Sequence, residues 1–168
     1  GAIGTVIARR FAALGFETRG YARTMKQIDG VEVFAGADQL ADFASGLDIV
    51  VSVLPLTPDT TAIMNAGFFA QLAEGAFVIN GGRGPQVHDE DLLAALQSGQ
   101  IGGAALDVFA VEPLPQDHPY WTHPKVRVWP HVAAQTNATS AADQVAAAIL
   151  AIINGQEPAN RVAWSRGY

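Results

Sequence analysis

Short apolar runs alternate with amphipathic helical patterns along this chain of 168 residues. The apolar runs are near-continuous, as in parallel strands buried on both faces, whereas the helical patterns place apolar side chains on one face and end before a glycine. This alternation predicts an α/β protein with a doubly wound parallel sheet. The predicted strands are residues 17–21, 31–34, 48–54, 76–80, 103–108 and 126–129, and the predicted helices are residues 2–14, 89–98 and 138–154.

The first predicted helix begins in a glycine loop. Gly1, Ala2, Ile3 and Gly4 match the last part of a G-x-G-x-x-G fingerprint, which binds the pyrophosphate of a dinucleotide at a helix N-terminus. Two glycines at this spacing are also common in ordinary helix starts. In a Rossmann-like domain the strand that leads into the loop lies at the centre of the sheet, and none precedes Gly1 in this sequence. We therefore expect a sheet that lacks its first strand, within a longer polypeptide.

The residues that follow the predicted strand 17–21 bear on the choice between NADPH and NADH. A Rossmann-like domain that prefers NAD places Asp or Glu there, where the carboxylate accepts hydrogen bonds from the ribose hydroxyls. This chain has Ala22 followed by Arg23 and Thr24, a cation and a hydroxyl that suit a 2′-phosphate. The pattern favours NADPH over NADH. The alternative is that Arg23 is only a solvated loop residue.

Three motifs that follow later strands carry polar groups suited to hydride transfer. Arg83 lies between glycines, and a guanidinium can bind a carboxylate through two hydrogen bonds. Asp107 lies at the end of the next predicted strand, Glu112 follows five residues later in the loop, and His131 follows the last strand. A carboxylate beside a histidine favours the imidazolium that donates a proton, so Glu112 is the expected partner of His131. Each residue alone could be a turn or surface residue, but parallel strands bring their carboxyl ends to one edge, where ligands bind.

Composition and charge argue against several other classes of function. The formal net charge is −6 and the ten Lys and Arg residues are dispersed, which argues against binding nucleic acid or an anionic membrane. The absence of cysteine excludes disulfides and thiolate catalysis and agrees with a cytoplasmic protein. No apolar run is long enough to cross a membrane. The four histidines lack the spacing of metal ligands, so no metal site is expected.

Together, these motifs resemble the D-isomer-specific 2-hydroxyacid dehydrogenase family, and within it the glyoxylate/hydroxypyruvate reductases. The resemblance spans essentially the whole chain and is carried by residues 1–4, 21–24, 54–57, 80–84, 106–113, 130–136 and 166–168. It implies an oxidoreductase in which Arg83, Glu112 and His131 are catalytic. The cofactor contacts that it and the glycine loop imply are Gly1, Ala2, Ile3, Gly4, Arg23, Thr24, Leu54, Pro55, Thr61, Asn80, Gly81, Gly82, Asp107, His131 and Ala133.

The resemblance also implies how the protein is organised and what it does. Residues 1–136 would form the dinucleotide-binding domain, and residues 137–168 a helix and tail that belong to the substrate domain. The expected protein is a homodimer that uses NADPH to reduce a small 2-oxoacid to the D-2-hydroxyacid. Two alternatives are a nucleotide-sensing, corepressor-like binding protein on the same scaffold and a fragment without activity of its own.

Overall fold

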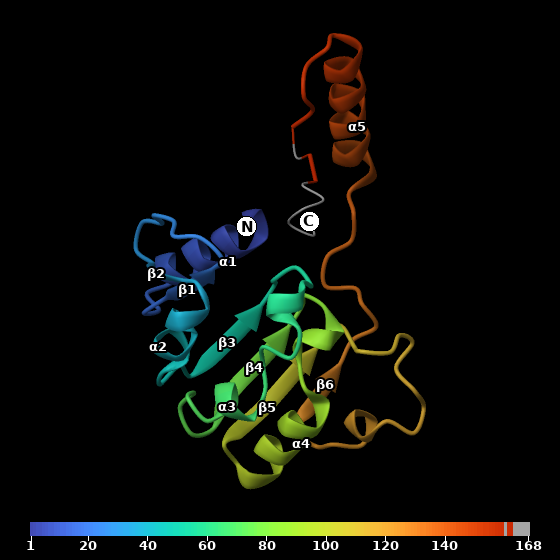
Figure 1. Ribbon diagram of the computed structural model, residues 1–168. Coiled ribbons are helices and arrows are strands. Elements are labelled where there is room, and N and C mark those ends of the chain that lie inside the picture. The colour runs from blue at the N-terminus through green and yellow to red at the C-terminus, as the bar shows by residue number, and fades with distance from the viewer. Residues whose placement is uncertain (160, 163–168) are drawn as a thin grey trace. The chain divides into compact units, whose positions relative to one another are not determined.

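The computed structural model describes residues 1–159, 161 and 162, and the chain forms two compact units (Figure 1). The first unit is Gly1–Pro130 and the second is His131–Tyr168. Residues 166–168, one of the motifs behind the family resemblance, lie outside the described residues. Every named strand belongs to the first unit.

The first unit is an α/β structure in which paired strands run parallel. All six predicted strands and both predicted helices of this unit are present, with bounds close to those expected, and Gly15 and Gly99 follow the two helices with φ of 89° each. The fold class is therefore confirmed. The elements in chain order are α1 (Ala2–Ala13), β1 (Arg19–Ala22), β2 (Glu32–Ala35), α2 (Leu40–Ala44), β3 (Ile49–Ser52), α3 (Ala66–Phe69), β4 (Ala76–Asn80), α4 (Asp89–Ser98), β5 (Ile101–Leu106) and β6 (Val126–Val128).

Several short helical elements of the first unit were not predicted from the sequence. The helices α2 and α3 have five and four residues, which is too short for an apolar repeat to show. Short 3₁₀ turns lie in the loops, where their side chains read as ordinary turn residues. These turns are η1 (Ala37–Gln39), η2 (Pro58–Thr60), η3 (Gly84–Gln86) and η4 (Pro119–Trp121).

The parallel sheet is divided between β1 and β3. The strand order is β1-β2 in one sheet and β3-β4-β5-β6 in another. A doubly wound order places the strand that leads into a glycine loop between the strands that here are β1 and β3. The sheet of the described chain is therefore divided at the position where its first strand was expected to be missing.

The hydrophobic core lies on one face of the four-stranded sheet. Val78 and Leu106 belong to a buried cluster with Phe69 of α3 and Leu92 of α4. The alternate positions of β4 are exposed, and the Phe77 side chain is 54% exposed. Within the described chain, the second face of β4 is therefore not covered by other residues. The alternation was hidden in the sequence because the exposed positions of this strand are also apolar.

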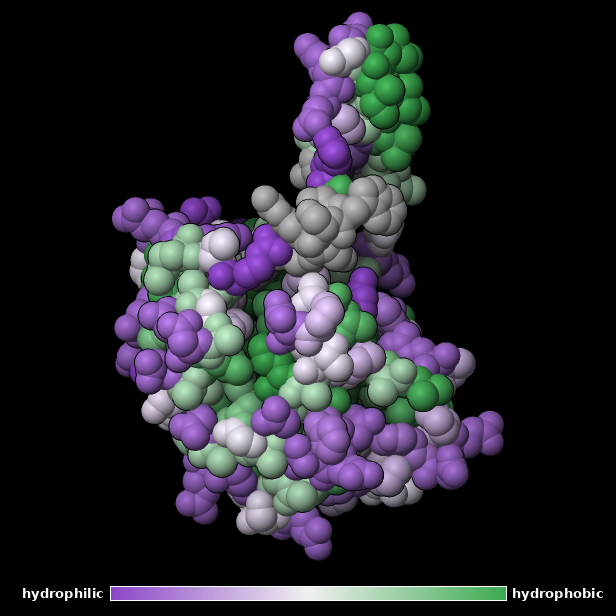
Figure 2. All heavy atoms as spheres, viewed as in Figure 1, coloured by the Kyte–Doolittle hydropathy of each residue, from purple (hydrophilic) through white to green (hydrophobic). Residues whose placement is uncertain are grey.

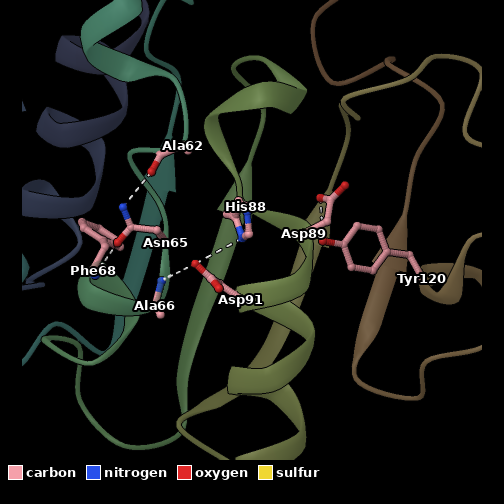
Figure 3. A network of polar contacts seen from close by, with 8 residues as sticks. All are labelled: Ala62, Asn65, Ala66, Phe68, His88, Asp89, Asp91 and Tyr120. Atoms are coloured by element: carbon pink, nitrogen blue, oxygen red, sulfur yellow. Dashed lines mark hydrogen bonds and ion pairs between the residues drawn. The ribbon is translucent and has the colours of Figure 1, made fainter.

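Two carboxylates in the first turn of α4 reach neighbouring segments in opposite directions (Figure 3). The Asp91 Oδ2 atom accepts a hydrogen bond from the backbone N–H of Ala66 at 2.8 Å, at the start of α3. The Asp89 Oδ1 atom accepts a hydrogen bond from the Tyr120 hydroxyl at 2.8 Å, in the loop before β6. The His118 Nε2 atom lies 3.7 Å from Asp89 Oδ2. The start of α4 is thereby tied to α3 on one side and to η4 on the other.

The hydrogen bond between Tyr120 and Asp89 should contribute measurably to stability. Burial, followed by the charge of Asp89 and the hydrogen bond to it, raises the pKa of the Tyr120 hydroxyl. We expect Tyr120→Phe to lower the free energy of unfolding by about 2 kcal/mol near neutral pH, the scale of a hydrogen bond to a charged group.

The same substitution should change how stability depends on pH. The pKa of the Tyr120 hydroxyl is higher in the folded chain than in the unfolded chain. The hydrogen bond therefore contributes its full stabilisation of the folded state below the unfolded pKa of about 10, and this contribution is lost as the pH rises above that value. Urea denaturation of the parent and Tyr120→Phe should show a stability gap that narrows above about pH 10. Equal stability of the two proteins near neutral pH would contradict this assignment.

The second unit contains helix α5 (Ala138–Ile153). The Asn137 Oδ1 atom caps it by accepting a hydrogen bond from the backbone N–H of Ser140 at 3.0 Å. Apolar side chains gather along one side of this helix (Figure 2). The side chains that are more than half exposed are Val145, Ile149, Leu150, Ile152 and Ile153. Within residues 1–159, 161 and 162, no helix is long and apolar enough to cross a membrane.

Candidate active site

The N-terminus of α1 is the first feature of the candidate site. Gly1 is the N-cap residue and no side chain caps this helix of twelve residues, so its first backbone N–H groups suit an anionic group. Gly1, Ala2 and Ile3 are exposed. A Cβ atom at Gly4 would lie 3.5 Å from Val53 Cγ2, which is an ordinary contact. Close helix packing therefore does not by itself require glycine at position 4.

Arg23 and Thr24 follow β1 directly, and both side chains are exposed. They lie where a Rossmann-like domain contacts the ribose of adenosine, at the carboxyl end of the second strand of the complete fold. The Tyr21 hydroxyl donates a hydrogen bond to the Gly36 carbonyl at 3.1 Å, which joins the ends of β1 and β2. A cation and a hydroxyl at this end of β1 are compatible with a bound 2′-phosphate.

The carboxyl ends of β3, β4 and β5 are aligned. Ser52 pairs with Asn80, and Asn80 pairs with Leu106. The backbone N–H of Gly81 donates to the Ser52 carbonyl at 3.0 Å, and that of Asp107 donates to the Asn80 carbonyl at 3.0 Å. The loops after β4 and β5 therefore begin side by side at one edge of the sheet, as the strand pattern predicted.

A buried amide shapes the loop that carries Arg83. Asn80 is 1% exposed, and its Oδ1 atom accepts a hydrogen bond from the Gly82 N–H at 3.0 Å. Its Nδ2 atom donates to the Arg83 carbonyl at 3.1 Å. The Arg83 side chain is exposed and donates from Nη1 to the Gly82 carbonyl at 2.7 Å. The buried Asn80 side chain thus fixes the backbone of this loop, while the Arg83 guanidinium stays at the surface, where it can bind a carboxylate.

The loop after β3 is held by a residue that sequence reasoning missed. Gln86 is fully buried, and its Nε2 atom donates to the carbonyls of Leu54 and Pro55 at 3.0 Å each. A glutamine beside a proline in a short turn normally reads as a surface residue, so the sequence carried no signal for this role. Thr61, also expected at the cofactor, is exposed and donates its hydroxyl proton to the Thr57 carbonyl at 2.9 Å.

The Arg83 loop also touches the loop that carries Glu112. The Glu112 Oε1 atom accepts a hydrogen bond from the Phe109 N–H at 2.9 Å. A Cβ atom at Gly84 would lie only 1.8 Å from the carbonyl carbon of Phe109. Gly84 is therefore required for the close approach of two backbones. Within the first unit, the structure brings together the loops that carry Arg83, Asp107 and Glu112.

The close approach at Gly84 predicts a large effect of a single methyl group. We expect Gly84→Ala to lower the free energy of unfolding by about 3 kcal/mol, the upper part of the usual range for overpacking, because its Cβ meets backbone atoms that cannot rotate away. Gly81→Ala is the matched control, since a Cβ at Gly81 meets nothing within 4 Å. Equal urea denaturation midpoints for the two variants would refute the contact.

His131 and Ala133 belong to the second unit, and both are exposed. The backbone of His131 has φ 57°, in the left-handed region that residues other than glycine adopt rarely. Strained backbone of this kind clusters at functional sites. It therefore supports a functional role for His131, whereas the pairing of His131 with Glu112 stays a prediction.

The fold and the aligned strand ends define a Rossmann-like nucleotide-binding domain. Residues 1–133 match the family pattern of the D-isomer specific 2-hydroxyacid dehydrogenase, NAD binding domain. The chain belongs to this family, and the resemblance seen in the sequence is confirmed.

Similar proteins agree with this assignment. The chain is 49% identical to glyoxylate/hydroxypyruvate reductase A of Serratia proteamaculans, over 100% of this chain and 54% of the relative. The structure of a D-isomer specific 2-hydroxyacid dehydrogenase from Xanthobacter autotrophicus Py2 in complex with NADPH has TM-score 0.97 and 45% identity, covering 100% of this chain and 69% of that one. An NADPH-dependent glyoxylate/hydroxypyruvate reductase from Sinorhizobium meliloti, solved with NADP and sulfate, has TM-score 0.95 and 39% identity. The match covers 100% of this chain and 54% of that one. The chain thus spans about half the length of the curated relatives it matches.

Proposed function

We propose that this chain forms the nucleotide-binding part of a reductase that uses NADPH to convert a small 2-oxoacid, such as glyoxylate or hydroxypyruvate, into the 2-hydroxyacid, in the D form where it is chiral. The observation that carries the proposal is the exposed guanidinium of Arg83 on a loop held by a buried Asn80. Family membership and relatives that are reductases of these two acids support it.

The residues that would hold the cofactor fit its chemistry. The uncapped start of α1, from Gly1 to Gly4, suits the pyrophosphate, and Arg23 with Thr24 suits the 2′-phosphate. Relatives solved with NADPH or NADP support the preference for this cofactor over NAD. When bound, NADPH supplies the hydride. Asp107 would contact the carboxamide of its nicotinamide, and the remaining proposed contacts are Leu54, Pro55, Thr61, Asn80, Gly81, Gly82, His131 and Ala133.

Three side chains would carry the rest of the chemistry. Arg83 binds the carboxylate and the ketone oxygen of the 2-oxoacid, which orients the carbonyl carbon for the incoming hydride. His131 donates its proton to the alkoxide oxygen as the carbonyl bond is reduced. Glu112 keeps the imidazole oriented and favours its protonated form. The product therefore gains one hydride on carbon and one proton on oxygen.

The organisation of the whole protein forms part of the proposal. Residues 137–168 would pack on a substrate domain, which agrees with the exposed apolar side chains along α5. The family resemblance supports a homodimer. The absence of cysteine agrees with a cytoplasmic location.

A steady-state assay tests the proposed reaction. The protein expressed from its complete coding sequence should oxidise NADPH with glyoxylate or hydroxypyruvate, and should use NADH less efficiently. The loss of reduced nicotinamide absorbance gives kcat and KM for each pair of cofactor and 2-oxoacid. Binding of NADPH without oxidation by any 2-oxoacid would instead favour a nucleotide-sensing protein on the same scaffold.

A further inference from the structure

The amide of Gln86 is buried and uses every one of its hydrogen-bonding positions. The side chain is 0% exposed. Its Oε1 atom accepts hydrogen bonds from the Arg83 N–H at 3.1 Å and from the Ser52 hydroxyl at 3.2 Å. Its Nε2 atom donates to the carbonyls of Leu54 and Pro55 at 3.0 Å each. An amide has two acceptor and two donor positions, so this side chain is held in one orientation.

The partners of this amide come from separate segments that converge at the carboxyl edge of the sheet. Ser52 ends β3, Leu54 and Pro55 form the loop after it, and Arg83 lies in the loop after β4. The Gln86 backbone adds another link, because its carbonyl accepts a hydrogen bond from the Met64 N–H at 2.9 Å. One residue therefore connects the loop expected to contact the cofactor with the loop expected to bind the 2-oxoacid.

The surroundings of Gln86 demand an amide rather than an apolar side chain. Two backbone carbonyls need donors while a hydroxyl and a backbone N–H need an acceptor, and leaving such groups buried without partners is costly. The backbone at Gly82 also packs closely against the Gln86 side chain, since a Cβ atom at Gly82 would lie 2.5 Å from Gln86 Oε1. A residue that only filled space would not require this donor and acceptor pattern.

We propose that Gln86 is a positioning residue that couples the cofactor to the 2-oxoacid through the two loops bonded to its amide. The inference rests on the proposed function, because it takes the Leu54–Pro55 loop as a cofactor contact and Arg83 as the carboxylate ligand. Because both loops are bonded to the same amide, a ligand that favours the bonded position of one loop also favours that position of the other. Each ligand therefore raises the affinity for the other by the same factor.

Gln86→Glu tests this coupling with little change in shape. Once ionised, the carboxylate faces the Leu54 and Pro55 carbonyls without a proton to donate, and because burial raises the pKa of such a carboxyl, this state is reached at alkaline pH. As the pH falls, the protonated carboxyl regains one donor, so the defect shrinks. Among the residues bonded to the amide, only Arg83 is ionisable. Groups that titrate in both proteins cancel when parent and variant are compared at each pH.

The primary readout is fluorescence titration of NADPH, with and without oxamate as an unreactive 2-oxoacid analogue, using the protein from its complete coding sequence. In the parent protein, oxamate should tighten NADPH binding by about tenfold, a typical coupling between two sites. In Gln86→Glu this tightening should be weakest at the highest pH measured and should return in part as the pH falls. The ratio of parent to variant kcat/KM should follow the same pH course.

Gln100→Glu is the matched control. The Gln100 Nε2 atom also donates to two backbone carbonyls, those of Phe69 and Leu72, at 3.0 Å each. It lies just before β5, at the opposite end of that strand from Asp107. This variant should lose stability but keep the coupling. Equal loss of coupling in both variants, or full coupling in Gln86→Glu at every pH, would overturn the assignment.

Ser52→Ala keeps the proposal testable if Gln86→Glu fails to fold. It removes a single hydrogen bond to the Gln86 Oε1 atom and should weaken the coupling by a few fold; unchanged coupling would overturn the proposal.

The inference and the proposed function fail in different ways. A parent protein that binds NADPH more tightly with oxamate yet reduces no 2-oxoacid contradicts only the proposed reaction, whereas turnover without such coupling contradicts only the role of Gln86.

Discussion

Replacing His131 with alanine is expected to lower kcat for 2-oxoacid reduction by about 10²–10⁴-fold, the usual contribution of a positioned general acid. In the proposed mechanism, the developing alkoxide would then have to take its proton from water. The side chain of His131 is exposed, so the stability of the protein should change little. Steady-state rates with NADPH and glyoxylate, together with a thermal melt, separate the two effects.

His123→Ala provides a matched histidine control. The His123 Nδ1 atom accepts a hydrogen bond from the Lys125 N–H at 3.2 Å, in the turn that leads into β6. This histidine has no place in the proposed chemistry, so its replacement should leave kcat close to the parent value. The assignment of His131 as the acid is wrong if His131→Ala turns over at the parent rate, or if both variants lose activity equally.

Replacing Arg83 with alanine is expected to lower kcat/KM for glyoxylate by about 10²–10³-fold, the scale of losing one strong donor to a developing charge. The guanidinium is proposed to hold both the carboxylate and the ketone oxygen. Glycolaldehyde lacks the carboxylate, so the substitution should lower kcat/KM for glycolaldehyde by a smaller factor. Comparing the two substrates in parent and variant therefore isolates the contribution of the carboxylate contact.

Arg127→Ala is the control for this substitution. The Arg127 side chain is also exposed, and its Nη1 atom also donates to backbone carbonyls, those of Pro124 and Val126. It should retain the parent kcat/KM for both substrates. If Arg83→Ala impairs glyoxylate and glycolaldehyde by the same factor, Arg83 does not bind the carboxylate.

Much of the fold was predictable because it follows from local patterns. The β4 strand and the α4 helix have the bounds that their apolar residues and the glycine at position 99 predicted. The candidate residues Arg83, Asp107 and Glu112 were predictable for a related reason. Each follows a recognisable strand, and parallel strands end at a common edge, so their order along the chain already placed them together.

Local patterns alone therefore determined the α/β class, most element bounds and the edge at which the chemistry gathers. Tertiary structure decided which face of β4 is covered, because apolar residues on both of its faces leave no alternation to detect. It also decided the roles of Gly84 and Gln86, whose importance depends on Phe109 and on the Leu54–Pro55 loop. Contacts between residues so far apart along the chain exist only after the strands have paired, so no pattern in neighbouring residues could predict them.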